Sequence, residues 1–180
     1  PNYALYSVNA ATFKTQLVCE DYATMRYPRW SPDGKKMVYT RYGMPWYRPR
    51  YTGSAAAQIW VYDFDKKVRR KVAGNDRQHL FSQFMPDGKN ILTVTTGAST
   101  PTLARLGEKA EKFSDNDQRA PNLWLAELNG GLKQLTHFKT DSVRYPSIAS
   151  KSGDIAFEHL DGIWLLKKGT AKAKPISLLV

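Results

Sequence analysis

The chain has 180 residues, 42% of them hydrophobic and 12% aromatic, enough for one globular domain or part of a larger one with a sizeable apolar core. The 27 lysines and arginines outnumber the 16 aspartates and glutamates, so the net charge of +11 favours anionic partners. No run of 18 apolar residues is present, so we expect no membrane-spanning helix, and the single Cys19 has no disulfide partner within the chain.

Two short strands are predicted within residues 1–20. The stretches "YALYSV" (3–8) and "TQLV" (15–18) are rich in aromatic and β-branched residues, which is typical of strands.

A unit of four strands is predicted in residues 21–74. Its strands are "MRYPRWS" (25–31), "KKMVYTR" (35–41), "AQIWVY" (57–62) and "RRKV" (69–72). The first two are joined by "SPDG", in which Pro32 fixes φ near about −65°, Asp33 bonds the local backbone and Gly34 can take a positive φ. This chemistry predicts a tight hairpin.

The same unit recurs in residues 75–138 and 139–180. Its second copy contains "FSQFMPDG" (81–88), "KNILTVT" (89–95), "PNLWLA" (121–126) and "KQLT" (133–136). Its third copy contains "YPSIASKSG" (145–153), "DIAFEH" (154–159), "DGIWLL" (161–166) and "KPIS" (174–177). The third turn lacks proline and has its glycine one position later, so we interpret it as a degraded form of the hairpin.

Regular spacing shows that these units are repeats. An interval of 21 residues separates three aromatic pairs: Tyr6 and Tyr27, Trp60 and Phe81, and Trp124 and Tyr145. The intervals from the second member of each pair to the next third-strand tryptophan vary in length. The insertions 42–56 and 96–120 therefore fall at the same point of the unit. Repeated four-stranded antiparallel units are typical of β-propeller blades, and a sandwich or meander barrel gives no reason for the constant interval. We therefore predict an all-β fold with three full blades after a half blade in residues 1–20.

Catalytic and metal-binding patterns are missing from the sequence. His79, His137 and His159 fall in different predicted strands, and no G-x-S-x-G, C-x-x-C or H-E-x-x-H motif occurs. Cys19 is interpreted as a structural or surface thiol, and Asp115 and Asp117 lack the glycine and distal glutamate of a calcium loop. We expect no catalytic residue, metal or cofactor in this segment.

The densest basic run, "KKVRRK" (66–71), is interpreted as a solvated outer strand and turn. No DNA-reading or RNA-reading motif accompanies it, so no nucleic-acid partner is expected.

The two insertions belong to the connection between the second and third strands of a blade, so they should lie on the same face as the loops that link blades. The first insertion gathers aromatic and arginine side chains that are frequent in binding hot spots: Trp46, Tyr47, Arg48, Arg50 and Tyr51. The alternative is an ordered loop whose rings cover the blade. The second insertion contains a possible short helix, 102–113, and is interpreted as a solvated or lid-like loop.

The innermost strands carry polar residues that could line a central channel: Arg26, Arg29, Gln83, Arg144 and Ser147. A positive channel would attract the acidic ends of peptides. The alternative is that half of these side chains point between blades.

The stretches "RYPRWSPDGKKMVYTR", "QIWVYDFDKKVRRKV", "NLWLAELNGGLKQLT" and "RYPSIASKSGDIAFEHLDGIWLL" resemble the propeller repeats of TolB and of tricorn-type proteases. The resemblance covers nearly the whole chain except 42–56 and 96–120. It is specific for this repeat superfamily and weak for any one member.

The resemblance implies a non-catalytic segment that binds peptides or proteins, as a gate or platform of a tricorn-like serine peptidase whose catalytic domain lies downstream. Two alternatives are a TolB-like protein-binding scaffold in the periplasm and a propeller cap of a prolyl-oligopeptidase or amidohydrolase. The same resemblance favours a periplasmic or secreted location. Because three and a half blades do not close a ring, we expect the chain to be part of a longer protein and its exposed blade faces to favour self-association.

Overall fold

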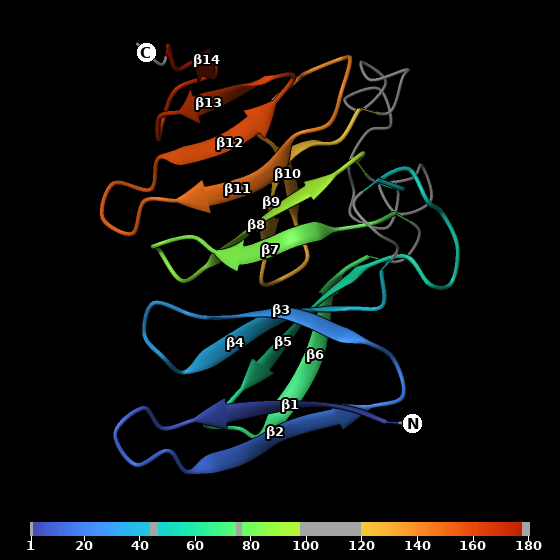
Figure 1. Cartoon of the computed structure of the whole chain (residues 1–180), viewed down its shortest axis with the longest axis vertical. Helices are drawn as coiled ribbons and strands as arrows, with labels where there is room; N and C mark the ends of the chain where they lie inside the picture. Colours follow the sequence, from blue (N-terminus) through green and yellow to red (C-terminus); the bar gives the residue numbers. More distant parts are fainter. Residues whose placement is uncertain (1, 44–46, 75–76, 98–119, 178–180) are drawn as a thin grey trace.

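A computed structural model describes residues 2–43, 47–74, 77–97 and 120–177. Within these ranges every regular element is a β-strand, so the all-β prediction is confirmed. The strands form a two-stranded sheet followed by three four-stranded sheets, all antiparallel and stacked one after another along the long axis of the molecule (Figure 1). This arrangement is that of consecutive propeller blades.

Each sheet is built from strands that are consecutive in the sequence. The first sheet contains β1 (Tyr3–Val8) and β2 (Thr15–Asp21). The second contains β3 (Met25–Trp30), β4 (Lys36–Arg41), β5 (Gln58–Asp63) and β6 (Val68–Ala73). The third contains β7 (Leu80–Phe84), β8 (Asn90–Thr95), β9 (Asn122–Glu127) and β10 (Leu132–Gln134). The fourth contains β11 (Arg144–Ile148), β12 (Ile155–His159), β13 (Gly162–Leu166) and β14 (Lys174–Pro175).

The predicted strands and the observed ones differ mainly at the outer edges of the sheets. β2 continues to Asp21, which pairs with Tyr3, so Cys19 lies within the strand and not at its end. β10 and β14 are shorter than predicted, with three and two residues.

The third-strand tryptophans occupy equivalent positions, as predicted. In each full blade the tryptophan pairs with a residue of the second strand. That residue stands twelve positions after the aromatic residue of the first strand, which is Tyr27, Phe81 or Tyr145. The pairs are Trp60 and Tyr39, Trp124 and Thr93, and Trp164 and Phe157.

The repeated turn also folds as predicted. Gly34 takes a φ of 70° and donates its N–H to the carbonyl of Ser31 at 2.9 Å, and Gly88 repeats this with a φ of 65° and a 2.9 Å bond to Met85. In the third copy the N–H of Gly153 donates to the carbonyl of Ala149 at 2.8 Å, which is four residues earlier and not three. The degraded hairpin is therefore one residue longer.

Every first strand carries a β-bulge that the sequence did not reveal. The register shifts between Arg26 and Arg29, between Leu80 and Gln83, and between Arg144 and Ser147. In all three blades the residue directly after Arg26, Leu80 or Arg144 is aromatic and has a left-handed φ. These residues are Tyr27 (55°), Phe81 (56°) and Tyr145 (45°). Glycine is the usual residue in this conformation, so three aromatic residues there are a distinctive feature of the chain.

The hydrophobic core is divided into three layers between the stacked sheets. The layer between the first two sheets includes Leu5, Val18 and Met37. The next includes Val38, Ile59, Val61, Phe84, Ile91 and Ala126. The last includes Leu92, Val94, Leu123, Phe157 and Leu166. Burial of one sheet face against the next is what holds the blades in series.

Candidate functional site

The blade-linking connections and the β4–β5 loop lie on one side of the stack, opposite the β3–β4, β7–β8 and β11–β12 hairpins (Figure 1). The expected shared face is therefore present for the first insertion. The helix predicted at 102–113 and the acidic residues Asp115 and Asp117 lie outside the described residues, and so does Trp46.

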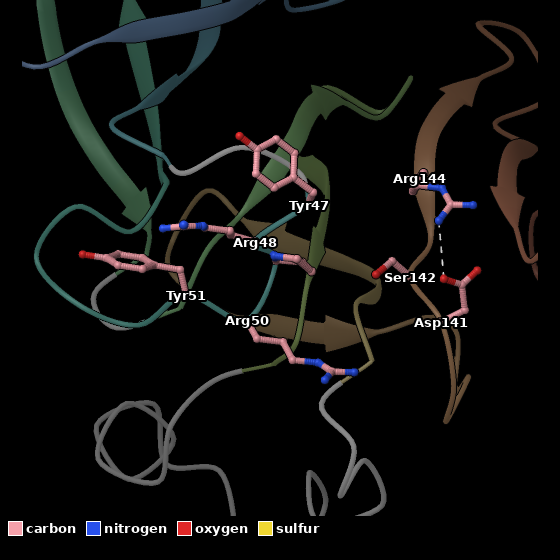
Figure 2. Close-up of a pocket in the computed structure, with 8 residues that line it drawn as sticks. Tyr47, Arg48, Arg50, Tyr51, Asp141, Ser142 and Arg144 are labelled. Carbon is pink, nitrogen blue, oxygen red and sulfur yellow. Dashed lines mark hydrogen bonds and ion pairs between the residues drawn. The ribbon is translucent and has the colours of Figure 1, made fainter.

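A cavity of about 570 Å³ lies on this loop-bearing face, between the β4–β5 loop and the start of the fourth sheet. We call it the arginine pocket. Figure 2 shows the loop residues on one side and the residues around β11 on the other. The lining consists of Tyr47, Arg48, Pro49, Arg50, Tyr51, Asp141, Ser142 and Arg144.

The loop is held in place by the connection to the following blade. The buried Gln78, just before β7, donates a hydrogen bond from Nε2 to the backbone carbonyl of Arg48. At its base the loop is closed by Gly43, whose N–H donates to the carbonyl of Ala55 at 3.2 Å. The first insertion is thus anchored to the linker of the next blade, and it faces the linker of the following one across the cavity.

The opposite wall is fixed by Asp141. Its Oδ2 accepts a hydrogen bond from the backbone N–H of Leu160 at 2.8 Å, and its Oδ1 lies 3.4 Å from Nη1 of Arg144. Burial alone would raise the pKa of Asp141, but the N–H groups of Ser142 and Leu160 and the charge of Arg144 outweigh it and lower the pKa. Asp141 is therefore a carboxylate at neutral pH, and it holds Arg144 in position.

Positive charge exceeds negative charge in the arginine pocket, with three arginines against one aspartate. Arg144 also has a weak contact with Glu158, at 3.8 Å, and donates to the carbonyl of Leu160. Among the described residues, no carboxylate lies within ion-pair distance of the Arg48 or Arg50 guanidinium. The pocket is therefore suited to an anionic group, which guanidinium groups bind through paired hydrogen bonds.

A second cavity, of about 660 Å³, runs along the first strands of the three full blades. We call it the ladder hollow, because its wall includes the three aromatic rings that occupy the bulges. Its lining consists of Tyr27, Arg29, Phe81, Ser82, Gln83, Tyr145, Pro146 and Ser147.

The structure brings together most of the residues that the sequence singled out. Tyr47, Arg48, Arg50, Tyr51 and Arg144 line the arginine pocket. Arg29, Gln83 and Ser147 line the ladder hollow, whereas the exposed Arg26 lines neither cavity. Sequence reasoning missed Asp141, Ser142 and the aromatic lining of the hollow. The repeated aromatic residue next to the inner polar positions was the available signal for the hollow.

Other reactive groups are not arranged for catalysis in the described residues. Burial raises the pKa of the Cys19 thiol, which keeps it protonated and weakly nucleophilic, and its sulfur lies 3.8 Å from that of Met25. His79 is buried just before β7 and His159 is buried at the end of β12, in a different sheet. No group of three or more histidine, cysteine, aspartate or glutamate side chains in the described ranges is arranged to hold a metal ion.

The described part of the chain contains no helix with the length and apolar character needed to cross a membrane.

No protein-family model matches the chain, and no curated protein sequence matches it. Solved structures do match. TolB from Acinetobacter baumannii is 17% identical with a TM-score of 0.69, over 96% of this chain and 37% of that chain. A puromycin hydrolase is 16% identical with a TM-score of 0.60, over 91% and 23%. The β-propeller domain of the Trilobed protease from Pyrococcus furiosus is 16% identical with a TM-score of 0.51, over 99% and 54%.

The fold is therefore that of a β-propeller segment. More particularly, the fold is similar to the propellers of TolB, of the puromycin hydrolase and of the Trilobed protease, and the likeness to TolB agrees with the resemblance found in the sequence. The chain spans less than two thirds of the length of each of these structures.

Proposed function

We propose that the chain is a non-catalytic propeller segment that binds peptides or protein segments, as a docking or gating platform of a tricorn-like peptidase. The arginine pocket is the binding site for a carboxylate of the ligand. The observation that carries this proposal is the approach of Arg48 and Arg50, from one blade, to Arg144, two blades further along the chain.

The chemistry of the arginine pocket supports a carboxylate as its ligand. Asp141 engages Arg144, and Arg48 and Arg50 lie on a loop that Gln78 anchors through its backbone, so their side chains remain able to reach a ligand. The rings of Tyr47 and Tyr51 add apolar surface beside these charges. A peptide C-terminus or an acidic side chain combines the same two properties, a carboxylate next to apolar atoms.

A peptide-binding measurement with matched variants tests the proposal. Short fluorescent peptides with a free C-terminal carboxylate or with a C-terminal amide are titrated with the protein. The free acid should bind at least about tenfold more tightly, since hydrogen bonds to charged groups contribute about 1.5–3 kcal/mol. Arg50→Ala should remove most of this difference, Arg50→Lys should retain part of it, and the exposed Lys14→Ala should retain all of it while making the same change in net charge.

Replacement of residues 44–52 by a glycine–serine linker gives a second test of the loop. Peptide affinity that is unchanged in this variant and in Arg50→Ala would contradict the proposal.

A second candidate function is a TolB-like scaffold that binds a folded protein partner. The likeness of fold to TolB supports it, with a TM-score of 0.69. Under this alternative, the protein used as bait in an envelope extract should retain one stoichiometric partner, and short peptides should not compete with it. Competition by free-acid peptides favours the peptide platform.

We also propose that the protein is located in the bacterial envelope, on the basis of its resemblance to TolB. Fractionation of cells that carry a tagged copy of the native gene would test this. Recovery in the periplasmic fraction is expected, and recovery with the cytosol would contradict it.

A further inference from the structure

Three aromatic side chains form a ladder across the first strands of the three full blades. The rings of Tyr27 and Phe81 have centroids 6.5 Å apart, and those of Phe81 and Tyr145 are 5.1 Å apart at 60°. All three line the ladder hollow. The ladder therefore forms one continuous apolar surface from three separate sheets.

The backbone conformation of the ladder is costly for aromatic residues. Each lies at a φ between 45° and 56°, a region in which Cβ crowds the neighbouring carbonyl and which glycine occupies without strain. Core packing does not explain the choice at two of the three positions, because Tyr27 is 51% exposed and Tyr145 is 48% exposed, whereas Phe81 is partly buried against the core. Strained residues of this kind are frequent where a ligand is held.

The polar groups in the hollow also point to a ligand. Ser82 is only 2% exposed, yet its Oγ has no hydrogen-bond partner among the described residues. Arg29 is the only charged residue in the lining, and Gln83, which also lines the hollow, donates from Nε2 to the carbonyl of Pro146 at 2.7 Å. A buried hydroxyl without a partner is costly, and Ser82 lies in the wall of the hollow, so a turn of its side chain toward the cavity would let a ligand with polar backbone groups satisfy it.

The two cavities are adjacent along strand β11. Arg144 lines the arginine pocket, and the next three residues, Tyr145 to Ser147, line the ladder hollow. Three strand residues span about 10 Å, which is also the span of three residues of an extended peptide. A peptide with its carboxylate in the arginine pocket can therefore place a side chain on the ladder two to three residues before its C-terminus.

We propose that the aromatic ladder is a specificity subsite for a large apolar side chain of the bound peptide, located at the third residue from its C-terminal carboxylate. This inference rests on the proposed function of the arginine pocket. Neighbouring rings are tilted by 40° and 60° to one another, so they do not form the flat platform on which a sugar ring stacks. The ladder thus favours a peptide over a glycan.

A peptide series with matched ladder variants tests the subsite. Fluorescent alanine-based peptides carry one tryptophan at the second, third, fourth or sixth residue from the C-terminus, as free acids and as amides. The protein should prefer tryptophan at the third position over alanine by about tenfold, as expected for burial of one large aromatic side chain. Tyr27→Gly and Tyr145→Gly remove a ring from a position that glycine occupies without strain, so both variants should fold.

Phe13→Gly is the matched control, because Phe13 has the same left-handed φ of 55° and is exposed in the β1–β2 hairpin. The ladder variants should lose the preference for tryptophan to within about twofold while they still distinguish free acid from amide, and Phe13→Gly should change neither property. If the wild-type protein prefers tryptophan at the third position but binds the free acid and the amide equally, the proposed function is contradicted and the subsite remains supported. An unchanged tryptophan preference in both ladder variants, or binding of oligosaccharides in place of peptides, would overturn the subsite.

Discussion

Arg41 binds the carboxylate of Asp21 through two hydrogen bonds, from Nε to Oδ2 at 2.8 Å and from Nη2 to Oδ1 at 3.0 Å. Asp21 ends β2 of the first sheet and Arg41 ends β4 of the second, so the pair joins two blades. Arg69 on β6 adds a third bond to Oδ2 at 2.9 Å, and the Arg41 guanidinium lies 4.3 Å from the ring centroid of Tyr42. The dense basic run that contains Arg69 thus has a structural role at one of its positions.

Substitution of Asp21 should loosen the first sheet from the second. Its side chain is 3% exposed, and Asp21→Asn leaves Arg41 buried without its counter-ion, which typically costs about 3–5 kcal/mol. Chemical denaturation followed by tryptophan fluorescence measures this loss. Glu20→Gln, an exposed neighbour with the same change of charge, should alter the free energy of unfolding by less than about 0.5 kcal/mol. Equal effects of the two variants would contradict the role of the pair.

The same carboxylate should make stability depend on pH. Hydrogen bonds from Arg41 lower the pKa of Asp21 from 3.8 to about 2, against the opposing effect of burial. Because the folded pKa lies below the unfolded one, the contribution is fully present above about pH 4 and is lost as the pH falls through about 2. Its size is on the order of 2 kcal/mol. The difference in unfolding free energy between wild type and Asp21→Asn should therefore shrink between pH 5 and pH 2, and a constant difference would contradict the assignment.

The repeat and its hairpins could be predicted because their chemistry is local. The 21-residue interval and the turn residues Asp33 and Gly34 specify strands and corners within one blade, and the tryptophans on the third strands mark equivalent positions. The loop-bearing face was also predictable, because the blade topology decides on which side each connection lies. These features depend on periodicity and turn conformation, both of which the sequence contains directly.

Features that depend on contacts between blades could not be predicted. Asp141 lies in an unremarkable linker, and only the fold places it against Arg144 and opposite the β4–β5 loop. The left-handed φ of Tyr27 has no sequence signal, because the residue that usually indicates it is glycine. The Asp21–Arg41 pair joins residues 20 positions apart that belong to different sheets.

Gly74 should be essential for the link between the second and third sheets. It has a φ of 98°, and a Cβ atom there would lie 2.7 Å from Cα of Gln58 and 2.8 Å from the carbonyl oxygen of Ala57. Gly74→Ala should therefore destabilise the protein by about 3 kcal/mol or more, since backbone strain and overpacking act together. Thermal denaturation measures the change.

Gly130→Ala is the control for backbone strain alone. Its φ is 104°, and a Cβ atom there meets nothing within 4 Å. We expect a cost of about 1–2 kcal/mol. If Gly74→Ala were no more costly than Gly130→Ala, the close approach at Gly74 would be refuted.

A substitution in the third hairpin turn should increase the stability of the protein. In the first two turns the Oδ1 atoms of Asp33 and Asp87 accept hydrogen bonds from the N–H two residues on, at 3.0 Å and 2.8 Å. In the third turn Ser152 has this role, with a longer bond of 3.2 Å to the N–H of Asp154. Ser152→Asp should stabilise the protein by about 0.5–1 kcal/mol, because a carboxylate accepts this bond better than a hydroxyl.

Ser150→Asp adds the same charge to the same turn at an exposed position without that bond. It should change stability by less than about 0.5 kcal/mol. An equal gain from both variants would show that the effect is one of net charge and not of turn geometry.

The most direct test of the central claim is a nuclear magnetic resonance titration that follows the arginine Nε–Hε signals as a free-acid peptide is added. The arginine pocket predicts large, saturable shifts for Arg48, Arg50 and Arg144, with the same midpoint, and little change for Arg70 on β6. The amidated peptide should produce these shifts only at a concentration about tenfold higher. Shifts that are confined to other arginines, or that are identical for acid and amide, would contradict a carboxylate site at this position.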